Sequence, residues 1–261
     1  MELLEGKSGL IFGIANERSY AWYIAQSLIG AGATCAFGCL PGEKNEARTR
    51  FAVDALGVED PWIRPCDVSK DAELDTIFAE YGRDFRRLDF VIHSIAFADR
   101  EWLSPGKFAR TPREAFHLAL DISSYSLLAM AQRAQEQMAA GGGGSIIAMS
   151  YFGAEKVIPG YNVMAVAKSA LECSARYLAH ELGEYNIRVN SISGGPLRTL
   201  AASAVGGFKD ILSHTEKRAP LRRNVEGGDV GSAAVFLVSD LASGITGETL
   251  HVDCGANTMG V

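Results

Sequence analysis

The sequence contains no long apolar run and no surplus of positive charge, and these absences exclude several kinds of protein. No stretch of its 261 residues approaches the roughly 18 consecutive apolar residues of a membrane-spanning helix. The segment 1–7 lacks a basic region followed by an apolar one, so we expect no signal peptide and a cytoplasmic location. The formal net charge of −6 argues against nucleic acid or an anionic membrane as a main partner.

Cysteine is scarce and scattered, which argues against a disulfide framework and a metal centre. An odd number of thiols at irregular spacing does not form a paired set, and no group of Cys or His residues has metal-ligand spacing. We therefore expect reduced thiols, most of them buried, and no bound metal. The cysteines are Cys35, Cys39, Cys66, Cys173 and Cys254.

Internal repeats and Pro/Gly/Ser-rich linkers are also lacking, so a single domain is expected. The chain instead alternates short apolar runs with amphipathic segments, which predicts an α/β fold with a doubly wound parallel sheet and helices on both faces. The expected strands are 10–12, 34–37, 62–66, 89–93, 145–149, 188–192 and 250–253. The main expected helices are 19–29, 43–56, 71–83, 112–140 and 160–185.

The G-x-G-x-x-G fingerprint of dinucleotide sites is absent after the first expected strand, where Gly13 is the only glycine. Gly13 still allows a tight turn, and Ser19 can cap the following helix. The first amides of that helix can hold a pyrophosphate. On this loop alone, a plain strand-to-helix connection is an equally good interpretation.

Other expected strand ends carry small or polar residues, which favours a cofactor groove. The carboxylate of Asp67 follows the third strand, where it could meet an adenine amine, and residues 94–96 follow the fourth strand beside the expected nicotinamide ribose. Backbone amides of residues 194–199 follow the sixth strand and could hold a carboxamide. Leu40 follows the second strand, where a carboxylate would favour NADH and an arginine NADPH. Because neither is present, we expect NADH without excluding NADPH.

Tyr161 and Lys168 are the strongest candidates for catalysis. They are seven residues apart, so in a helix both side chains would lie on one face, about two turns apart. A cation near a phenol favours the phenolate and so helps the phenol to donate a hydrogen bond to a developing oxyanion. Tyr151 stands at the end of the fifth expected strand, at the sheet edge where doubly wound folds place their chemistry.

The chain resembles the enoyl-acyl-carrier-protein reductases, a divergent branch of the short-chain dehydrogenase/reductases, over nearly its whole length. The most specific matches are the segments 151–168 and 121–126; residues 93–95, 195–203 and 251–253 add to them. Ordinary members of the superfamily carry Tyr-x-x-x-Lys, but Met164 stands four residues before Lys168. The Tyr-x6-Lys spacing is typical of the enoyl reductases.

The resemblance implies a Rossmann-like fold with a seven-stranded parallel sheet, and NADH-dependent reduction of the trans-2 double bond of an enoyl thioester carried on acyl carrier protein. Tyr161 would stabilise the enolate, and Lys168 would hold the nicotinamide ribose. Tyr151 would line the acyl pocket and serve as a third catalytic residue. The implied cofactor-binding residues are Gly13, Ala15, Ser19, Tyr20, Leu40, Asp67, Val68, Ser94, Ile95, Ala96, Lys168, Pro196, Leu197 and Thr199.

The family pattern also implies a mobile substrate-binding loop at about 197–217 and a homotetramer. The implied substrate-binding residues are Phe97, Ala98, Tyr151, Tyr161, Met164, Ala201 and Phe208.

The sequence departs from the family at two places. Ala96 stands where glycine is usual, so its methyl group should narrow the space over the nicotinamide. Basic residues around the expected loop, such as Lys209, Lys217 and Arg218, are diluted by Gly206 and Asp210. That dilution weakens the expected docking surface for the acidic carrier protein, to which Arg198, Arg222 and Arg223 could also contribute.

Two other functions fit the same features. One is reduction of an enoyl-CoA or another unsaturated carbonyl compound, which differs only in the handle on the substrate. The other is a catalytically inactive dinucleotide-binding sensor, because a fold alone does not define an activity.

Overall fold

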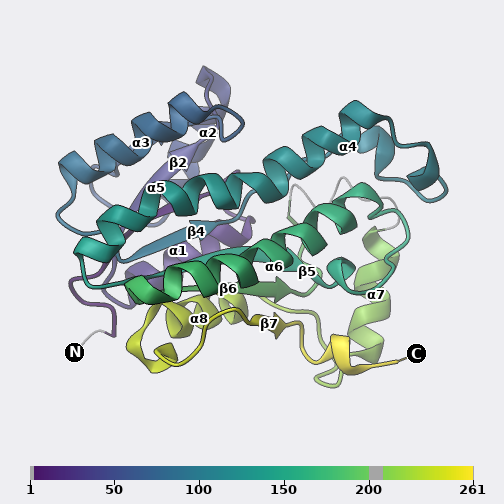
Figure 1. Cartoon of the computed structure of the whole chain (residues 1–261). Helices are drawn as coiled ribbons and strands as arrows, with labels where there is room; N and C mark the ends of the chain where they lie inside the picture. The colour runs from purple at the N-terminus through teal and green to yellow at the C-terminus, as the bar shows by residue number, and fades with distance from the viewer. Residues whose placement is uncertain (1–2, 200–207, 261) are drawn as a thin grey trace.

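A computed structural model describes residues 3–199 and 208–260 and contains a seven-stranded sheet in which every pairing is parallel (Figure 1). The strand order is β3-β2-β1-β4-β5-β6-β7, which confirms the predicted doubly wound sheet. The strands are β1 (Ser8–Phe12), β2 (Thr34–Cys39), β3 (Ile63–Pro65), β4 (Phe90–His93), β5 (Gly144–Tyr151), β6 (Ile187–Gly194) and β7 (Thr249–Val252).

Helices cover both faces of the sheet, because successive strand residues point to opposite sides and both sides are apolar. In β1, Ile11 belongs to the core under α1, α2 and α8, whereas Leu10 and Phe12 belong to the core under α3, α5 and α6. The helices are α1 (Tyr20–Gly30), α2 (Glu43–Asp54), α3 (Asp71–Asp84), α4 (Arg113–Leu120), α5 (Ser126–Ala140), α6 (Val163–Leu182), α7 (Phe208–Arg218) and α8 (Gly227–Val238).

The topology creates one switch point, between β1 and β4. From β1 the chain winds outward to β2 and β3, then returns to β4 on the other side. In such a sheet a ligand binds outside the carboxyl ends of the strands at this reversal. The strand ends singled out in the sequence therefore meet along one edge.

The long helix predicted over 112–140 is interrupted. A π-helical turn, η3 (Asp121–Tyr125), separates α4 from α5. Side-chain hydroxyls within and just after this turn form hydrogen bonds that hold the end of β4. Local π geometry of this kind is frequent at functional sites.

The helix predicted from Gly160 begins later, at Val163. Tyr161 therefore lies in a turn just before α6, and the helical spacing argument applied to it was wrong in its geometry. The start of the helix is delayed because Asn162 has a φ of 47°, which a right-handed helix does not contain.

The predicted loop at 197–217 is described in part. Thr199 is described, residues 200–207 with Ala201 lie outside the described residues, and α7 begins at Phe208. The C-terminal part of the segment is therefore a helix. Nothing described tests its mobility, which remains a prediction.

The thiols agree with the sequence analysis. Cys35, Cys39, Cys66 and Cys254 are buried and Cys173 is exposed, all five as free cysteines.

Within the described ranges, no helix combines the length and apolar character needed to cross a bilayer. The same ranges hold no group of three or more His, Cys, Asp or Glu side chains arranged to bind a metal ion.

Candidate active site

The predicted catalytic tyrosines meet at the carboxyl end of β5. Tyr151 is the last residue of that strand, and its ring centroid lies 5.0 Å from that of Tyr161, at an interplanar angle of 70°. Gly153 makes this possible: a Cβ atom there would lie 2.4 Å from Cδ1 of Tyr161. The turn after β5 therefore has a glycine where the Tyr161 ring needs the space.

Tyr161 is largely buried. The residue is 9% exposed, and burial raises the pKa of its phenol above the ordinary range, with smaller contributions from Tyr151 and Glu172. The sequence argument expected Lys168 to favour the phenolate, whereas burial is the largest influence on the pKa of this phenol and favours its neutral form. Tyr161 is thus a neutral phenol that can donate a hydrogen bond to an oxyanion.

Lys168 is buried beneath the same corner. Its Nζ donates to the carbonyl of Met149, at 2.6 Å, and more weakly to that of Ile95, at 3.4 Å. Burial lowers the pKa of Lys168 to about 8, and nearby Glu172 opposes that shift. The ammonium group therefore joins the end of β5 to the loop after β4, and its long contact leaves it able to take a better acceptor.

Glu172 was missed by the sequence analysis. It lies four residues after Lys168 on α6 and is 7% exposed, and its Oε1 accepts a hydrogen bond from the hydroxyl of Ser150. Burial raises the pKa of this carboxyl group. A carboxylic residue one helical turn after a candidate lysine, within an apolar helix, was the available signal. Adjacent residues of β5 thus hold two successive turns of α6.

Hydroxyl groups at the π turn hold the loop that follows β4. The Oγ of Ser123 accepts from the backbone N–H of Phe97, at 2.9 Å, and lies 3.1 Å from the carbonyl of the same residue. The fully buried His93 is 2.7 Å from Oγ of Ser126 through Nε2, and burial lowers its pKa to about 3. The loop with Ser94, Ile95 and Ala96 is therefore fixed at both ends. The sequence analysis quoted both serines without assigning these contacts.

The turn after β1 leaves almost no space above the sheet. Gly13 has a φ of 102°, and a Cβ atom there would lie 2.0 Å from the carbonyl oxygen of Ser94. Ser19 occupies the N-cap position of α1, but its hydroxyl donates to the carbonyl of Asn16, at 2.6 Å, and does not cap the helix. The first amides of α1 remain the candidate pyrophosphate site, beside half-buried Ala15.

Tyr20 connects the first helix to the end of β6. Its hydroxyl donates to the carbonyl of Gly195, and burial raises its pKa far above the ordinary range. The side chain is therefore committed to the backbone that follows β6. The predicted contact with the cofactor remains untested.

The residues predicted to contact the adenosine differ in exposure. Leu40 follows β2 and is 58% exposed, whereas Val68 is buried. Oδ1 of Asp67 already accepts from the hydroxyl of Ser69, at 2.7 Å, and from its backbone N–H, at 3.1 Å. Its Oδ2 lies 3.4 Å from Nζ of Lys70, so both carboxylate oxygens already have partners within the turn.

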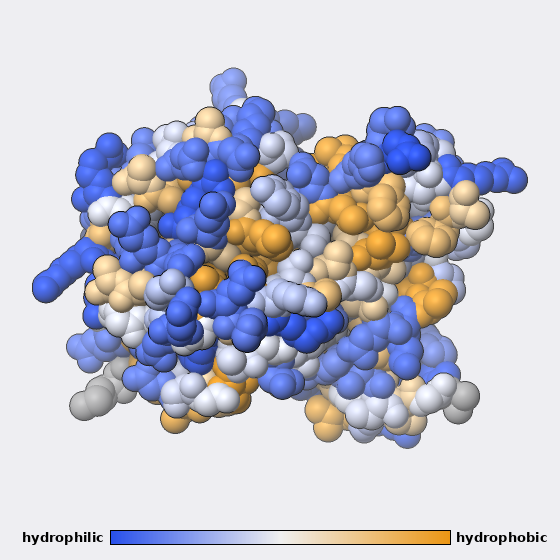
Figure 2. Space-filling view, in the orientation of Figure 1, coloured by the Kyte–Doolittle hydropathy of each residue, from blue (hydrophilic) through white to orange (hydrophobic). Residues whose placement is uncertain are grey.

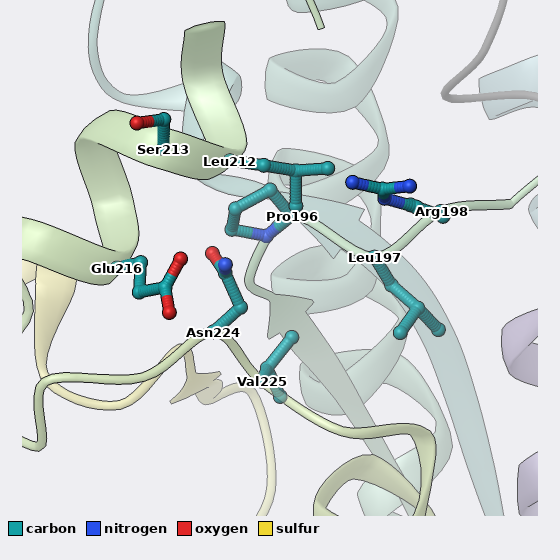
Figure 3. A pocket seen from close by; sticks show the side chains of 8 residues that line it. All are labelled: Pro196, Leu197, Arg198, Leu212, Ser213, Glu216, Asn224 and Val225. Atoms are coloured by element: carbon teal, nitrogen blue, oxygen red, sulfur yellow. The ribbon is translucent and has the colours of Figure 1, made fainter. Parts of the chain in front are cut away.

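The residues after β6 line a pocket under α7 (Figure 3). Pro196 faces Leu212 in this view, with the side chains of Glu216 and Asn224 beside it. Leu197 lines the same pocket. Thr199 is the last described residue before the segment 200–207.

The expected acyl-binding residues are only partly brought together. Tyr161 and Met164 share a small apolar cluster with Leu103, and Tyr151 and Ala98 pack against it. Phe97 stands apart and is 47% exposed. Phe208 is the first residue of α7, and Ala201 lies outside the described residues.

The parallel sheet with its switch point, together with buried Tyr161 and Lys168, defines a dinucleotide-dependent reductase of the short-chain type. The family model described as enoyl-(acyl carrier protein) reductase matches residues 13–257. The chain therefore belongs to the enoyl-(acyl carrier protein) reductase family.

Named relatives are similar over their entire length. The enoyl-[acyl-carrier-protein] reductase [NADH] FabI of Bacillus cereus is 47% identical over 260 residues, with 100% of each chain covered. A solved B. cereus enoyl-acyl carrier protein reductase, with NADP+ and indole naphthyridinone, has a TM-score of 0.96, 47% identity and complete coverage of both chains. The Anaplasma phagocytophilum reductase in complex with NAD has a TM-score of 0.93 and 45% identity, covering 99% of this chain and 97% of that one.

Proposed function

We propose that the protein reduces the trans-2 double bond of enoyl thioesters carried on acyl carrier protein, with NADH as the reductant, in fatty-acid elongation. The observation that carries the proposal is the contact between partly buried Tyr151 and buried Tyr161, close in the fold to buried Lys168, at the carboxyl ends of the strands of a family member. The named relatives support NADH and the carrier-linked substrate.

The groove fits a dinucleotide. Gly13 keeps the turn after β1 free of a side chain, and Ala96 is exposed at the end of β4. NADH, when bound, supplies the hydride to the β-carbon of the substrate. The Lys168 ammonium would hold the nicotinamide ribose, exchanging its 3.4 Å contact with Ile95 for a hydroxyl acceptor. Residues 194–199 would hold the carboxamide.

Tyr161 would act on the thioester oxygen. As the β-carbon accepts hydride, charge moves to this oxygen, and a neutral phenol in a dry site stabilises that charge strongly. Tyr151 would form the wall of the acyl pocket and orient Tyr161, because their rings are in edge contact. Burial raises the pKa of Tyr151 to about 12, so it too remains protonated near neutral pH.

The remaining expectations belong to the same proposal. The segment 197–217 would close over cofactor and acyl chain. Apolar patches appear on the face shown in Figure 2, and exposed apolar side chains on and between α4, α5 and α6 support the expected homotetramer. These side chains are Leu118, Tyr125, Leu128 and Tyr177. The expected cytoplasmic location remains a prediction.

The docking surface for the carrier protein is expected near α7. Lys217 and Arg218 end that helix, whereas Arg223 is already paired with Asp229 at 2.6 Å. Fewer basic side chains are therefore available to bind the carrier protein than the number of Lys and Arg residues in this part of the sequence implies.

The test is NADH oxidation with 2-enoyl thioesters on acyl carrier protein and on CoA, with NADPH in parallel. Turnover faster on the carrier-linked substrate, and with NADH, is the expected result. Faster turnover on CoA would favour an enoyl-CoA reductase. Tight NADH binding without turnover of any enoyl thioester would contradict the proposal and favour a sensor.

A further inference from the structure

The residue that follows Tyr161 has an unusual backbone conformation. Asn162 has a φ of 47° and a ψ of −122°, and the N–H of Met164 donates to the carbonyl of Tyr161 at 3.1 Å. This is the geometry of a type II′ turn, whose first central residue is normally glycine. A non-glycine residue persists there when its surroundings hold it in place, and such positions cluster at functional sites.

The side chain of Asn162 does not serve the helix it precedes. Asparagine is a common N-cap residue, but this carboxamide makes no cap hydrogen bond to α6. Its Nδ2 instead donates to the carbonyls of Trp102, at 2.6 Å, and Ser104, at 2.7 Å. Both amide hydrogens are therefore used on a segment that lies about sixty positions earlier in the sequence.

The segment that receives these bonds contributes to the acyl side of the site. Leu103, between the two acceptors, is 5% exposed and shares an apolar cluster with Tyr161 and Met164. Around it the chain is largely exposed, from η1 (Arg100–Trp102) through Phe108, which is 50% exposed. Leu103 is thus a buried residue within a largely exposed segment. Asn162 forms hydrogen bonds with the residues on either side of it, Trp102 and Ser104.

We infer that Asn162 is a positioning residue that fixes Leu103 against Tyr161 and thereby sets the wall along which a longer acyl chain extends. This inference rests on the proposed function. Asn162 fixes the position of Tyr161 relative to Leu103. Its backbone forms the turn that follows Tyr161, and its side chain binds the residues on either side of Leu103. A short enoyl group ends before this wall, whereas a long one must lie along it.

The decisive variant is Asn162→Gly, which adopts the same backbone angles without strain and removes the side chain with its carboxamide. Loss of two hydrogen bonds should lower kcat/KM for a dodecenoyl thioester about tenfold, while kcat/KM for crotonyl thioester changes less than about twofold. NADH affinity and the melting temperature should stay near their wild-type values. Asn162→Asp, which cannot donate, should show the same dependence on chain length.

Asn186 provides a matched control after the far end of α6. It also has a positive φ, of 58°, and its Nδ2 donates to a backbone carbonyl, that of Gly142, at 2.9 Å. Asn186→Gly should leave the ratio of long-chain to short-chain kcat/KM unchanged.

A double-mutant cycle with Leu103→Ala tests the coupling. Because both changes release the same wall, the double variant should lose little more than the larger single variant. Equal loss on both substrates in Asn162→Gly, or no loss on either, would overturn the inference. Absence of turnover in the wild type, with NADH bound, would instead overturn the proposed function.

Discussion

The proposed catalytic corner (Tyr151, Tyr161 and Lys168) and the proposed adenosine end of the cofactor site (Leu40, Asp67 and Val68) are built in different ways. At the corner, Tyr161 and Lys168 are 9% and 4% exposed, and their surroundings are tied together by side-chain hydrogen bonds. At the adenosine end, Leu40 is 58% exposed, and the contacts of Asp67 are with nearby residues such as Ser69 and Glu73. The corner depends on particular side chains, whereas the adenosine end depends mainly on backbone.

The difference follows from what each region must do. Stabilising a developing charge requires donors fixed in a water-free place, so small displacements are costly. Holding an adenosine requires surface and amides, which many side chains permit. Substitutions at the corner should therefore have large effects on kcat, and those at the adenosine end small effects on cofactor affinity.

The largest expected effect is that of Tyr161→Phe. Removing an oxyanion donor should lower kcat about 10²- to 10³-fold while NADH affinity stays within about twofold. Tyr151→Phe, the matched change on the neighbouring ring, should lower kcat less than about tenfold. Steady-state kinetics and fluorescence titration of NADH measure the two quantities. Equal losses in both variants would erase the distinction drawn between the two phenols.

Lys168 should produce the next largest effect, on binding rather than on chemistry. Lys168→Met should weaken NADH binding about 10- to 100-fold at neutral pH, since hydrogen bonds to a charged group are lost.

The pH dependence gives the sign of this effect. Burial lowers the pKa of Lys168 to about 8, so the ammonium fraction falls as pH rises through 8. Wild-type NADH affinity should be constant below that pH and should weaken above it by up to about tenfold per unit. The methionine variant should lack this dependence in calorimetric titrations. A flat wild-type profile across pH 8 would show that the lysine charge does not hold the ribose.

The sheet and the candidate pair Tyr161 and Lys168 could be predicted from the sequence, because both produce local sequence patterns. Buried parallel strands appear as short apolar runs, and Tyr161 and Lys168 keep a fixed separation. The helix start was wrong because Asn162 adopts its conformation through acceptors at Trp102 and Ser104, which are distant in sequence. Local propensity does not contain such contacts.

The same limit applies to the π turn. Residues 112–140 have a continuous helical pattern, and the break at 121–125 accompanies bonds from Ser123 to Phe97 and from His93 to Ser126. The burial that raises the pKa of Tyr161 was not predictable either, since burial depends on the whole fold. The residues that neighbour Tyr161 in the sequence do not determine how much of its side chain is exposed in the folded protein.

The adenosine end should respond modestly to charge. Leu40→Asp should shift preference toward NADH and Leu40→Arg toward NADPH, each by about tenfold, because the exposed position follows β2 where ribose substituents are recognised. The ratio of kcat/KM values for the two cofactors reports the shift. Change in kcat without change in this ratio would contradict the division between the two regions.

Ala96 should give the smallest effect, because it lies between the two regions. It is exposed in the loop after β4, between Ile95, whose carbonyl contacts Lys168, and Phe97, whose backbone is held by Ser123. Ala96→Gly removes one methyl group from the expected nicotinamide face without touching either contact. A flat aromatic inhibitor stacked there should bind a few-fold more tightly, about the effect of one methyl group.

The measurement is inhibitor affinity in the presence of saturating NAD+, with NADH affinity as the control. Because the loop is fastened at both ends, kcat should change less than about twofold, which separates steric relief from loosening of the backbone. Weaker inhibitor binding together with a lower kcat would mean that the methyl group rigidifies the loop. Ala96 would then act like the residues of the catalytic corner, where substitutions lower kcat, and the loop after β4 would have to be counted as part of that corner.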